Sequence, residues 1–283
     1  MAALLTTSRT MPEAIDALRV ELAHSTLEGR RSGNEDFAGA TTPEGALLDA
    51  KGMLLGGADG VGGHAKGREA AEYSVRNLLN DYYATPDTWS VAKSFDVVLG
   101  ATNRWLLAYA RKAREHAGMA TTLTALVLRG SRYYVGHVGD SRAYLWRGGV
   151  LTQLTEDHTW DHPELNNVLR RAIGLDGHLV VDHADGELVA GDRFVLLTDG
   201  VWGTLADIEL AHLLARHTTA EAAANGMALE AVQRGSSDNC TALVANIVSV
   251  PQSNLRDTLD GAHKLPLPPR LKHGQEIDGL RVL

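Results

Sequence analysis

The sequence has little of several features that mark particular classes of protein. Its 283 residues include one cysteine, Cys240, so an internal disulfide is excluded and a reducing cytoplasm is the expected location. The residues beside Cys240 favour a small buried side chain over a nucleophile. No apolar run approaches the roughly 18 residues of a membrane span, and the N-terminus lacks the basic and apolar regions of a signal peptide. We therefore expect a cytoplasmic protein without a membrane span.

Basic runs are also absent, and the formal net charge is −8 at pH 7. Nucleic acid is therefore not an expected partner, because its phosphates would be repelled. Hydrophobic residues make up 44% of the chain and charged residues 22%, which is ordinary for a globular protein with a substantial core.

One stretch, GGADGVGGHAKG at residues 56–67, could hold either a phosphate or a metal. Gly60, Gly62 and Ala65 match the dinucleotide fingerprint between a strand and a helix. The helix that follows, however, leads into another helix and not into a second parallel strand. Asp59 would also direct a carboxylate at the pyrophosphate, where positive potential is needed. A metal explains Asp59 better, provided that the rest of the chain supplies further ligands.

The order of the predicted elements indicates the fold class. Apolar spacing predicts two pairs of helices, at about 64–83 and 89–117, and at about 205–215 and 219–234. Alternating or apolar runs predict strands before, between and after these pairs, including a hairpin within 186–200. A short helix is expected at about 163–173. Strands and helices segregated in this way favour antiparallel sheets over a doubly wound parallel sheet.

Composition shifts after Pro251, where LPLPPRLKHGQEIDG is polar and punctuated by proline. We therefore divide the chain into an N-terminal extension (1–17), a folded domain (18–250) and a proline-containing linker or tail (251–283). Because the tail is too polar to form a core, we expect its removal to leave the stability of the domain nearly unchanged.

Five aspartates lie where apolar or turn-rich segments end or begin, namely Asp36, Asp59, Asp140, Asp199 and Asp238. Aspartate is common in turns, but Asp59 and Asp199 each close an apolar strand. If the strand ends converge, carboxylates about 5 Å apart repel by roughly 3 kcal/mol per pair at an effective dielectric near 20. Such a cluster is stable only when cations neutralise it, and all-oxygen ligands select Mg²⁺ or Mn²⁺. The sequence therefore predicts a metal centre.

Seven motifs complete the pattern: RRSGNEDF, GGADGVGGHAKG, MATTLTAL, HVGDSRAYL, LTEDHT, LTDGVW and SSDNCTALV. Their order and spacing over residues 18–250 resemble the metal-dependent protein phosphatases of type 2C, and most of all the bacterial serine/threonine branch. The resemblance implies an α+β fold, a four-layer α/β/β/α sandwich of two antiparallel sheets flanked by helix pairs. It also implies a binuclear metal site at one end of the sandwich.

The resemblance assigns the metal ligands by position. Asp59 would bridge two divalent cations, Mn²⁺ or Mg²⁺, and the carbonyl of Gly60 would complete the shell of one of them. Asp199 and Asp238 would bind the other ion. Asp140, together with Asp199, matches a weaker site for a third ion.

The same resemblance assigns the residues around the metals. Asp36 and Glu35 would hold water molecules on the ions, which makes Asp36 part of the metal site. Arg31 matches the arginine that grips the substrate phosphate, and its planar fork of donors suits a phosphate dianion. Thr122 would pack behind the site.

The implied reaction is hydrolysis of phosphoserine and phosphothreonine in proteins. Two ions would lower the pKa of a bridging water, and the resulting hydroxide would attack phosphorus directly, without a covalent phosphoenzyme. The predicted catalytic residues are Arg31, Asp59 and Asp199. The alternative is a catalytically inactive module that keeps the fold for binding or regulation.

Three positions depart from the pattern of the family. Ala120 stands where a glycine usually precedes the threonines. Val61 occupies the position of a general-acid histidine in eukaryotic members, which leaves His64 or a water on a metal as the acid. The segment WDHPEL, at residues 160–165, is much shorter than the corresponding stretch of most bacterial relatives, part of which is a mobile flap.

The closing GQEIDGLRVL, at residues 274–283, resembles the start of a serine/threonine protein kinase domain, just before its glycine-rich loop. We therefore expect a phosphatase that is fused to a kinase domain or acts beside one. The alternative is an ordinary disordered tail.

Overall fold

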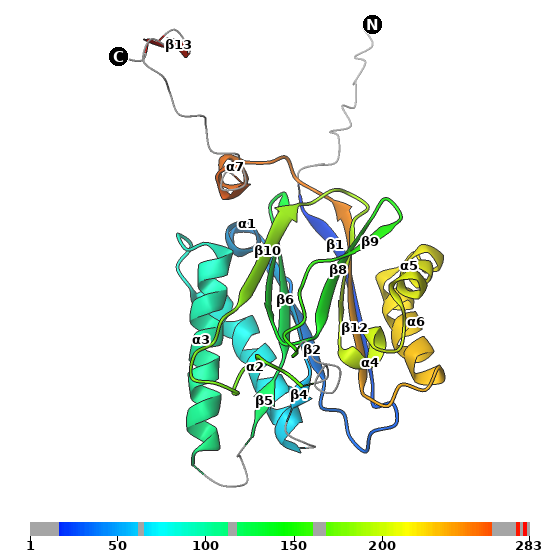
Figure 1. Cartoon of the computed structure of the whole chain (residues 1–283). Helices are drawn as coiled ribbons and strands as arrows, with labels where there is room; N and C mark the ends of the chain where they lie inside the picture. The colour runs from blue at the N-terminus through cyan, green and yellow to red at the C-terminus, as the bar shows by residue number, and fades with distance from the viewer. Residues whose placement is uncertain are drawn as a thin grey trace, which may run out of the picture.

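Two five-stranded antiparallel sheets form the centre of the molecule (Figure 1). The computed structural model describes residues 17–61, 65–112, 118–160 and 168–261, with the backbone of 276–277 and 280–281. The first sheet has the order β1 (Arg19–Leu27), β12 (Cys240–Ser249), β11 (Arg193–Leu197), β8 (Arg142–Arg147), β9 (Val150–Gln153). The second has the order β10 (Asp182–Glu187), β7 (Arg132–Val138), β6 (Leu123–Arg129), β3 (Met53–Ala58), β2 (Phe37–Thr41).

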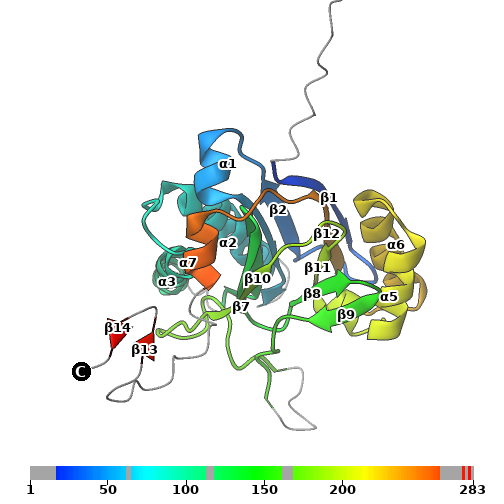
Figure 2. The ribbon, with the colours of Figure 1, turned by 90° about the horizontal axis from the view of Figure 1, so that it is seen from above.

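A pair of helices covers the outer face of each sheet, as the view from above shows (Figure 2). The second sheet is covered by α2 (Ala65–Ala84) and α3 (Val91–Ala110). The first sheet is covered by α5 (Asp207–Arg216) and α6 (Ala220–Gln233). This arrangement confirms the predicted four-layer α/β/β/α sandwich of the α+β class.

The central strands are buried on both faces, which explains their apolar sequences. Every residue of β3, β6 and β11 is buried, because the opposite sheet covers one face and a helix layer the other. Leu55, Leu126, Phe194 and Leu243 fill the space between the sheets. These strands therefore read as continuous apolar runs, and their ends are well defined in the sequence.

The hairpin predicted within 186–200 is wrong. β10 pairs with β7 in the second sheet, whereas β11 pairs with β8 and β12 in the first. The turn between the two strands therefore carries the chain from one sheet to the other. Turn residues signal a change of direction in the sequence, but they do not specify which sheet the next strand joins.

The short helix predicted at 163–173 is also wrong over its described part, 168–173. The backbone of Ile173 pairs with that of Thr121 in a two-way bridge, at 2.9 Å in each direction, so it is not available for helical hydrogen bonds. A second isolated bridge joins Leu169 to Thr159. Residues 163–167 of this prediction, and 113–117 of the predicted second helix, lie outside the described residues.

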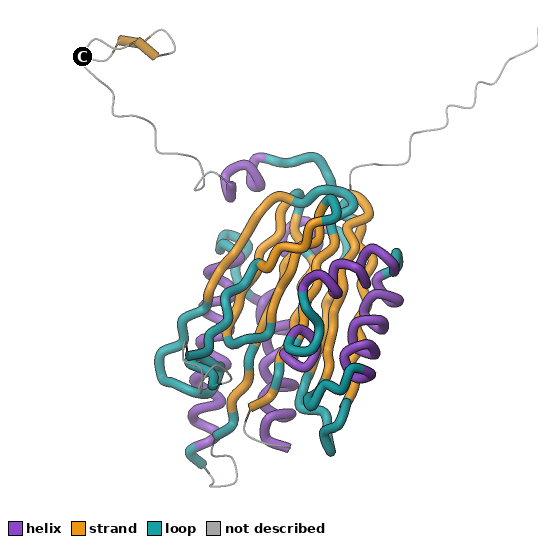
Figure 3. Tube along the Cα trace, turned by 45° about the vertical axis from the view of Figure 1, so that its right-hand side comes forward, coloured by secondary structure: helices purple, strands orange, loops and turns teal. Residues whose placement is uncertain are grey.

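The folded part of the chain continues past the boundary predicted near residue 250. Helix α7 (Leu255–Gly261) packs on the end of the second sheet (Figures 1 and 3). Asp257 in this helix is buried and accepts hydrogen bonds from the backbone N–H and the hydroxyl of Ser131. The polar composition of this segment suggested a linker, but its charged side chains find partners on the domain.

The remaining elements are short. They are α1 (Ala46–Lys51), α4 (Asp199–Trp202), the paired strands β4 (Gly60–Val61) and β5 (Ala120–Thr121), and the paired strands β13 (Glu276–Ile277) and β14 (Leu280–Arg281). Across the described residues, no helix combines the length and apolar character that crossing a membrane requires.

Candidate metal centre

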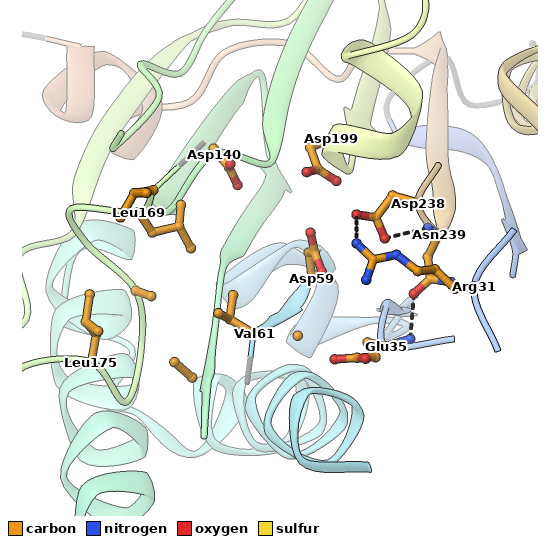
Figure 4. Close-up of a pocket in the computed structure, with 14 residues that line it drawn as sticks. Arg31, Glu35, Asp59, Val61, Asp140, Leu169, Leu175, Asp199, Asp238 and Asn239 are labelled. Carbon is orange, nitrogen blue, oxygen red and sulfur yellow. Dashed lines mark hydrogen bonds and ion pairs between the residues drawn. The ribbon is translucent and has the colours of Figure 1, made fainter. Parts of the chain in front are cut away.

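Four of the five predicted aspartates line one cavity at the end of the sandwich away from α7 (Figure 4). The strands β3, β7 and β11 end there and β12 begins there, because neighbouring strands of each sheet run antiparallel. Their ends deliver Asp59, Asp140, Asp199 and Asp238 to a cavity of about 480 Å³. Gly60, Arg31 and Glu35 line it as well.

The glycines of the stretch 56–67 serve a close approach of two backbone segments. A Cβ atom on Gly60 would lie 2.1 Å from the carbonyl of Gly67 at the start of α2. A Cβ atom on Gly67 would lie 2.1 Å from a carboxylate oxygen of Glu35. Only glycine at both positions lets the first turn of α2 pack against the loop that carries Asp59.

The backbone of Asp59 is fixed by two threonines. The amide of Asp59 donates to the hydroxyl of Thr122 at 2.8 Å, and its carbonyl accepts from the hydroxyl of Thr121 at 2.8 Å. The hydroxyl of Thr122 also meets that of Ser141 at 2.8 Å. Thr122, predicted only to pack behind the site, is therefore a hydrogen-bonding support for Asp59, and Thr121 and Ser141 are supports that the sequence did not reveal.

A buried histidine holds the turn before Asp140. Gly139 has φ of 113°, and its amide donates to Nδ1 of His158 at 3.0 Å. Because a backbone N–H can only donate, Nδ1 carries no proton, and Nε2–H donates to Asp182 at 2.9 Å. Arg171 holds the carboxylate of Asp182 from the other side at 2.6 Å.

Asp36 lies behind the cavity and does not line it. One of its carboxylate oxygens accepts a hydrogen bond from the hydroxyl of Thr198 at 2.8 Å. The other oxygen is buried without a hydrogen-bond partner, and one oxygen of Asp199 is in the same condition. Both atoms are carboxylate oxygens of one cluster, and leaving a buried polar group unsatisfied costs about 1–3 kcal/mol.

The cluster carries more negative charge than the chain neutralises. Burial, followed by the charges of Asp199 and Asp238, raises the pKa of Asp36 to about 7. Burial and the charge of Asp199 raise the pKa of Asp140 to about 7. Burial and neighbouring aspartates also raise the pKa of Asp59 well above its ordinary value, and that of Asp199 in the same direction. A cation at this position would reverse these shifts.

Arg31 supplies one positive charge at the edge of the cavity. Its guanidinium lies 2.5 Å from a carboxylate oxygen of Asp238, and this contact raises the pKa of Arg31 above its ordinary value. The side chain of Arg31 is half exposed. The residue that was predicted to grip a phosphate therefore lies beside a predicted metal ligand, within reach of a ligand in the cavity.

The donor set fits hard divalent cations. Within the described residues, no group of three or more histidine, cysteine, aspartate or glutamate side chains is placed to hold one ion. Mg²⁺ does not need such a group, because it is often held by one or two carboxylates and keeps several waters. The unsatisfied oxygens of Asp36 and Asp199 and the carboxylates among the lining residues match that mode of binding.

Two predicted features lie wholly or mainly outside the described residues. They are His64, the candidate general acid, and residues 161–165 of the short segment WDHPEL. Val61 and Ala120, the other two departures from the family pattern, both line the cavity.

Comparisons with known proteins agree with the class that the sandwich and its carboxylate cluster define. Residues 36–232 match the sequence profile of protein phosphatase 2C. A serine/threonine protein phosphatase, PstP, of Mycobacterium tuberculosis is 33% identical over 251 residues, covering 82% of this chain. A serine/threonine phosphatase, stp, of Listeria monocytogenes is 32% identical over 206 residues, covering 66% of this chain and 81% of its own length.

A solved structure gives the same result. The serine/threonine phosphatase of S. agalactiae superposes with a TM-score of 0.73 at 27% identity, over 81% of this chain and 100% of that chain. This chain belongs to the protein phosphatase 2C family, and its relatives include bacterial serine/threonine phosphatases. It spans 46% of the length of the mycobacterial relative.

Proposed function

We propose that this chain is a metal-dependent protein serine/threonine phosphatase that uses two Mn²⁺ or Mg²⁺ ions and has room for a weaker third. The observation that carries the proposal is the cavity lined by Asp59, Asp140, Asp199 and Asp238. The pKa values of Asp59, Asp140 and Asp199 are raised, and a buried oxygen of Asp199 lacks a partner. Membership of the family and the names of its relatives support the same reaction.

The roles that we propose for the ligands come from the resemblance to the family, and their positions in the cavity support them. Asp59 lies between the first sheet, which carries Asp199 and Asp238, and α2, and it would help to hold both ions. The carbonyl of Gly60 would join it, and Asp140 with Asp199 would take a third ion. Asp36 and Glu35 would hold waters of the ions. Bound divalent ions would supply Lewis acidity and lower the pKa of water, so that it can attack phosphorus.

Arg31 would bind the substrate. In the structure its guanidinium contacts Asp238, and a phosphate dianion in the cavity would offer oxygens to its remaining N–H groups. The fork of donors would orient the phosphate and offset its charge as the bond to the leaving group breaks. The threonines behind Asp59 keep its backbone in place during this step.

Release of phosphate from a phosphothreonine peptide tests the proposal. With Mn²⁺ or Mg²⁺ we expect turnover that is abolished by a chelator and restored by added metal. If the protein bound Mn²⁺ in calorimetry but released no phosphate under any metal, the alternative of an inactive regulatory or binding module would replace this proposal. Turnover that persists in the chelator would remove the metal centre from the mechanism.

We also propose a serine/threonine kinase domain, fused or separate, as a functional partner. The support is the resemblance of residues 274–283 to the start of a kinase domain. Phosphoproteins made by such a kinase would be the substrates. A pull-down with residues 251–283 that recovers no kinase, and a reading frame that encodes none beyond them, would contradict this proposal.

A further inference from the structure

The cavity that holds the aspartates also has an apolar side. Its apolar lining residues are Val61, Ala120, Val168, Leu169, Ala172 and Leu175, which we call the apolar wall. Figure 4 shows Leu169 and Leu175 on one side of Asp59, with Arg31 and Glu35 on the other. The two halves of one cavity therefore offer different chemistry to a ligand.

Three side chains of the apolar wall, Val61, Val168 and Leu175, are exposed although the backbone around them is firmly held. Ile173 is buried and pairs in both directions with Thr121. The next amide, that of Gly174, donates to the side chain of Asn103 at 2.7 Å, and Asn103 in turn donates to the carbonyl of Asp176 at 2.8 Å. The segment around Leu175 is thus tied to β5 and to α3.

The other end of the segment is held as well. The amide of Arg170 donates to the carbonyl of His158 at 2.6 Å, and that of Trp160 donates to the carbonyl of Val168. Despite these anchors, Val61 is 39% exposed, Val168 47% and Leu175 50%. These backbone hydrogen bonds hold the exposed side chains in place on the wall of the cavity.

Exposed apolar side chains are common on protein surfaces, and a single one needs no explanation. Leu229 on α6 is 50% exposed, like Leu175, but it does not line this cavity. What distinguishes the apolar wall is that several such side chains share one concave surface with the carboxylate cluster. Binding sites combine apolar walls with a few polar groups in this way.

We propose that the apolar wall is a subsite for an apolar side chain next to the phosphorylated residue of a protein substrate. This inference rests on the proposed phosphatase function and adds a preference among substrates. A phosphate placed between Arg31 and the aspartates would direct the peptide across Val61. An extended peptide advances about 3.3 Å per residue, so a side chain within three residues would reach Leu169 and Leu175.

Paired phosphothreonine peptides test this subsite. All residues around the phosphothreonine are glycine or serine, except for one leucine that is moved through three positions on each side. We expect one or two positions of leucine to raise kcat/KM by about five- to tenfold over the peptide without leucine in Mn²⁺. A tenfold change corresponds to about 1.4 kcal/mol, a reasonable value for partial burial of one side chain.

Two variants and a matched control locate the effect. Leu175→Ser and Val168→Ser should reduce the ratio of the two kcat/KM values to less than about twofold, whereas Leu229→Ser should retain it. Far-UV circular dichroism checks that each variant is folded, and the alanine substitution at the same position replaces any variant that is not. Equal rates for leucine and glycine peptides in the unsubstituted protein would overturn the subsite, as would a preference that survives Leu175→Ser.

Binding measurements keep this test separate from that of the enzyme. Fluorescence anisotropy with the same labelled peptides in Mn²⁺ measures Kd without requiring turnover. If no peptide is hydrolysed but leucine still tightens binding by about fivefold or more, the proposed phosphatase function fails and the subsite stands. If peptides are hydrolysed and leucine changes neither Kd nor kcat/KM, the subsite fails and the phosphatase function stands.

Discussion

The two ends of the sandwich differ in how their buried and partly buried aspartates are partnered. At the α7 end, Asp257 accepts from Ser131, and Asp260 contacts Arg129 and the hydroxyl of Tyr134. At the cavity end, Asp36 and Asp199 each keep a buried oxygen without a partner in the described structure. Buried charges that serve stability are paired within the fold. A cluster that the fold leaves unneutralised is better explained by a ligand that brings positive charge.

The substitution Asp59→Asn, at the cavity end, should have the largest effect on activity. Loss of this carboxylate should lower kcat/KM for phosphothreonine peptides by about a thousandfold or more, because the substitution removes a bridging ligand and its charge. The fold should survive, since one like charge leaves a repelling cluster. Phosphate release with Mn²⁺ measures the first effect, and thermal unfolding in a chelator measures the second. Activity within tenfold of the unsubstituted protein would place the reaction elsewhere.

At the other end, Asp257→Ala should destabilise the protein without removing its activity. The substitution leaves the amide of Ser131 without its acceptor and detaches α7, so we expect a loss of about 2–3 kcal/mol in the free energy of unfolding. For a domain of this size that corresponds to a decrease in Tm of about 5–10 °C.

Asp257→Asn is the matched control, because its amide oxygen can still accept from Ser131. It should retain more stability than Asp257→Ala, while metal-dependent turnover at 20 °C stays near that of the unsubstituted protein in both. If Asp257→Ala left Tm unchanged, α7 would be dispensable, as the polar composition of residues 251–283 first indicated.

These two ends also differ in how far the sequence predicted them. The aspartates of the cavity could be found because Asp59 and Asp199 close strands that are buried on both faces and therefore read as apolar runs. The ends of these strands meet at one end of the sandwich because neighbouring strands run antiparallel. Docking of α7 could not be found in this way, since its contacts join polar side chains more than a hundred positions apart, such as Asp260 and Arg129.

Contacts between distant polar side chains could not be predicted inside the cavity either. The contact of Arg31 with Asp238 and the role of the Thr122 hydroxyl depend on segments that meet only in the fold. The exchange of sheets between β10 and β11 had no local signal either, because a turn fixes direction and not the partner strand. Sequence patterns were thus sufficient to predict the layers of the fold and the types of metal ligand. They could not predict which polar side chains pair with one another.

At the cavity end, a smaller effect is expected in how the stability of the metal-free protein depends on pH. The pKa of Asp140 is raised to about 7 in the folded state, so between pH 4 and 7 the folded protein binds more protons than the unfolded chain. The contribution of this group to stability is therefore lost as pH rises through that range. In a chelator, Asp140→Asn should be more stable than the unsubstituted protein at pH 8, by about 2–4 kcal/mol, and equal to it near pH 4.

Urea unfolding of both proteins at several pH values measures this difference. Saturating Mn²⁺ should reduce or reverse the advantage of the variant at pH 8, because the ion stabilises only the carboxylate form. A difference between the two proteins that does not change with pH would mean that Asp140 is ionised in the folded state without help from a cation.

The smallest effect concerns the cation at the edge of the cavity. Arg31→Ala should raise KM for phosphopeptides by about tenfold, or about 1.4 kcal/mol, with a smaller change in kcat, because the guanidinium is expected to bind the phosphate before and during reaction. Its contact with Asp238 gives Arg31 a second possible role, which is to order the metal ligands.

Titration with Mn²⁺ separates the two roles of Arg31. A phosphate-binding role leaves metal affinity within about threefold, since removal of one exposed positive charge near a ligand would, if anything, favour the cation. A fall in metal affinity as large as the rise in KM would assign Arg31 to the structure of the metal centre, and the phosphate would then need another partner among the residues around the cavity.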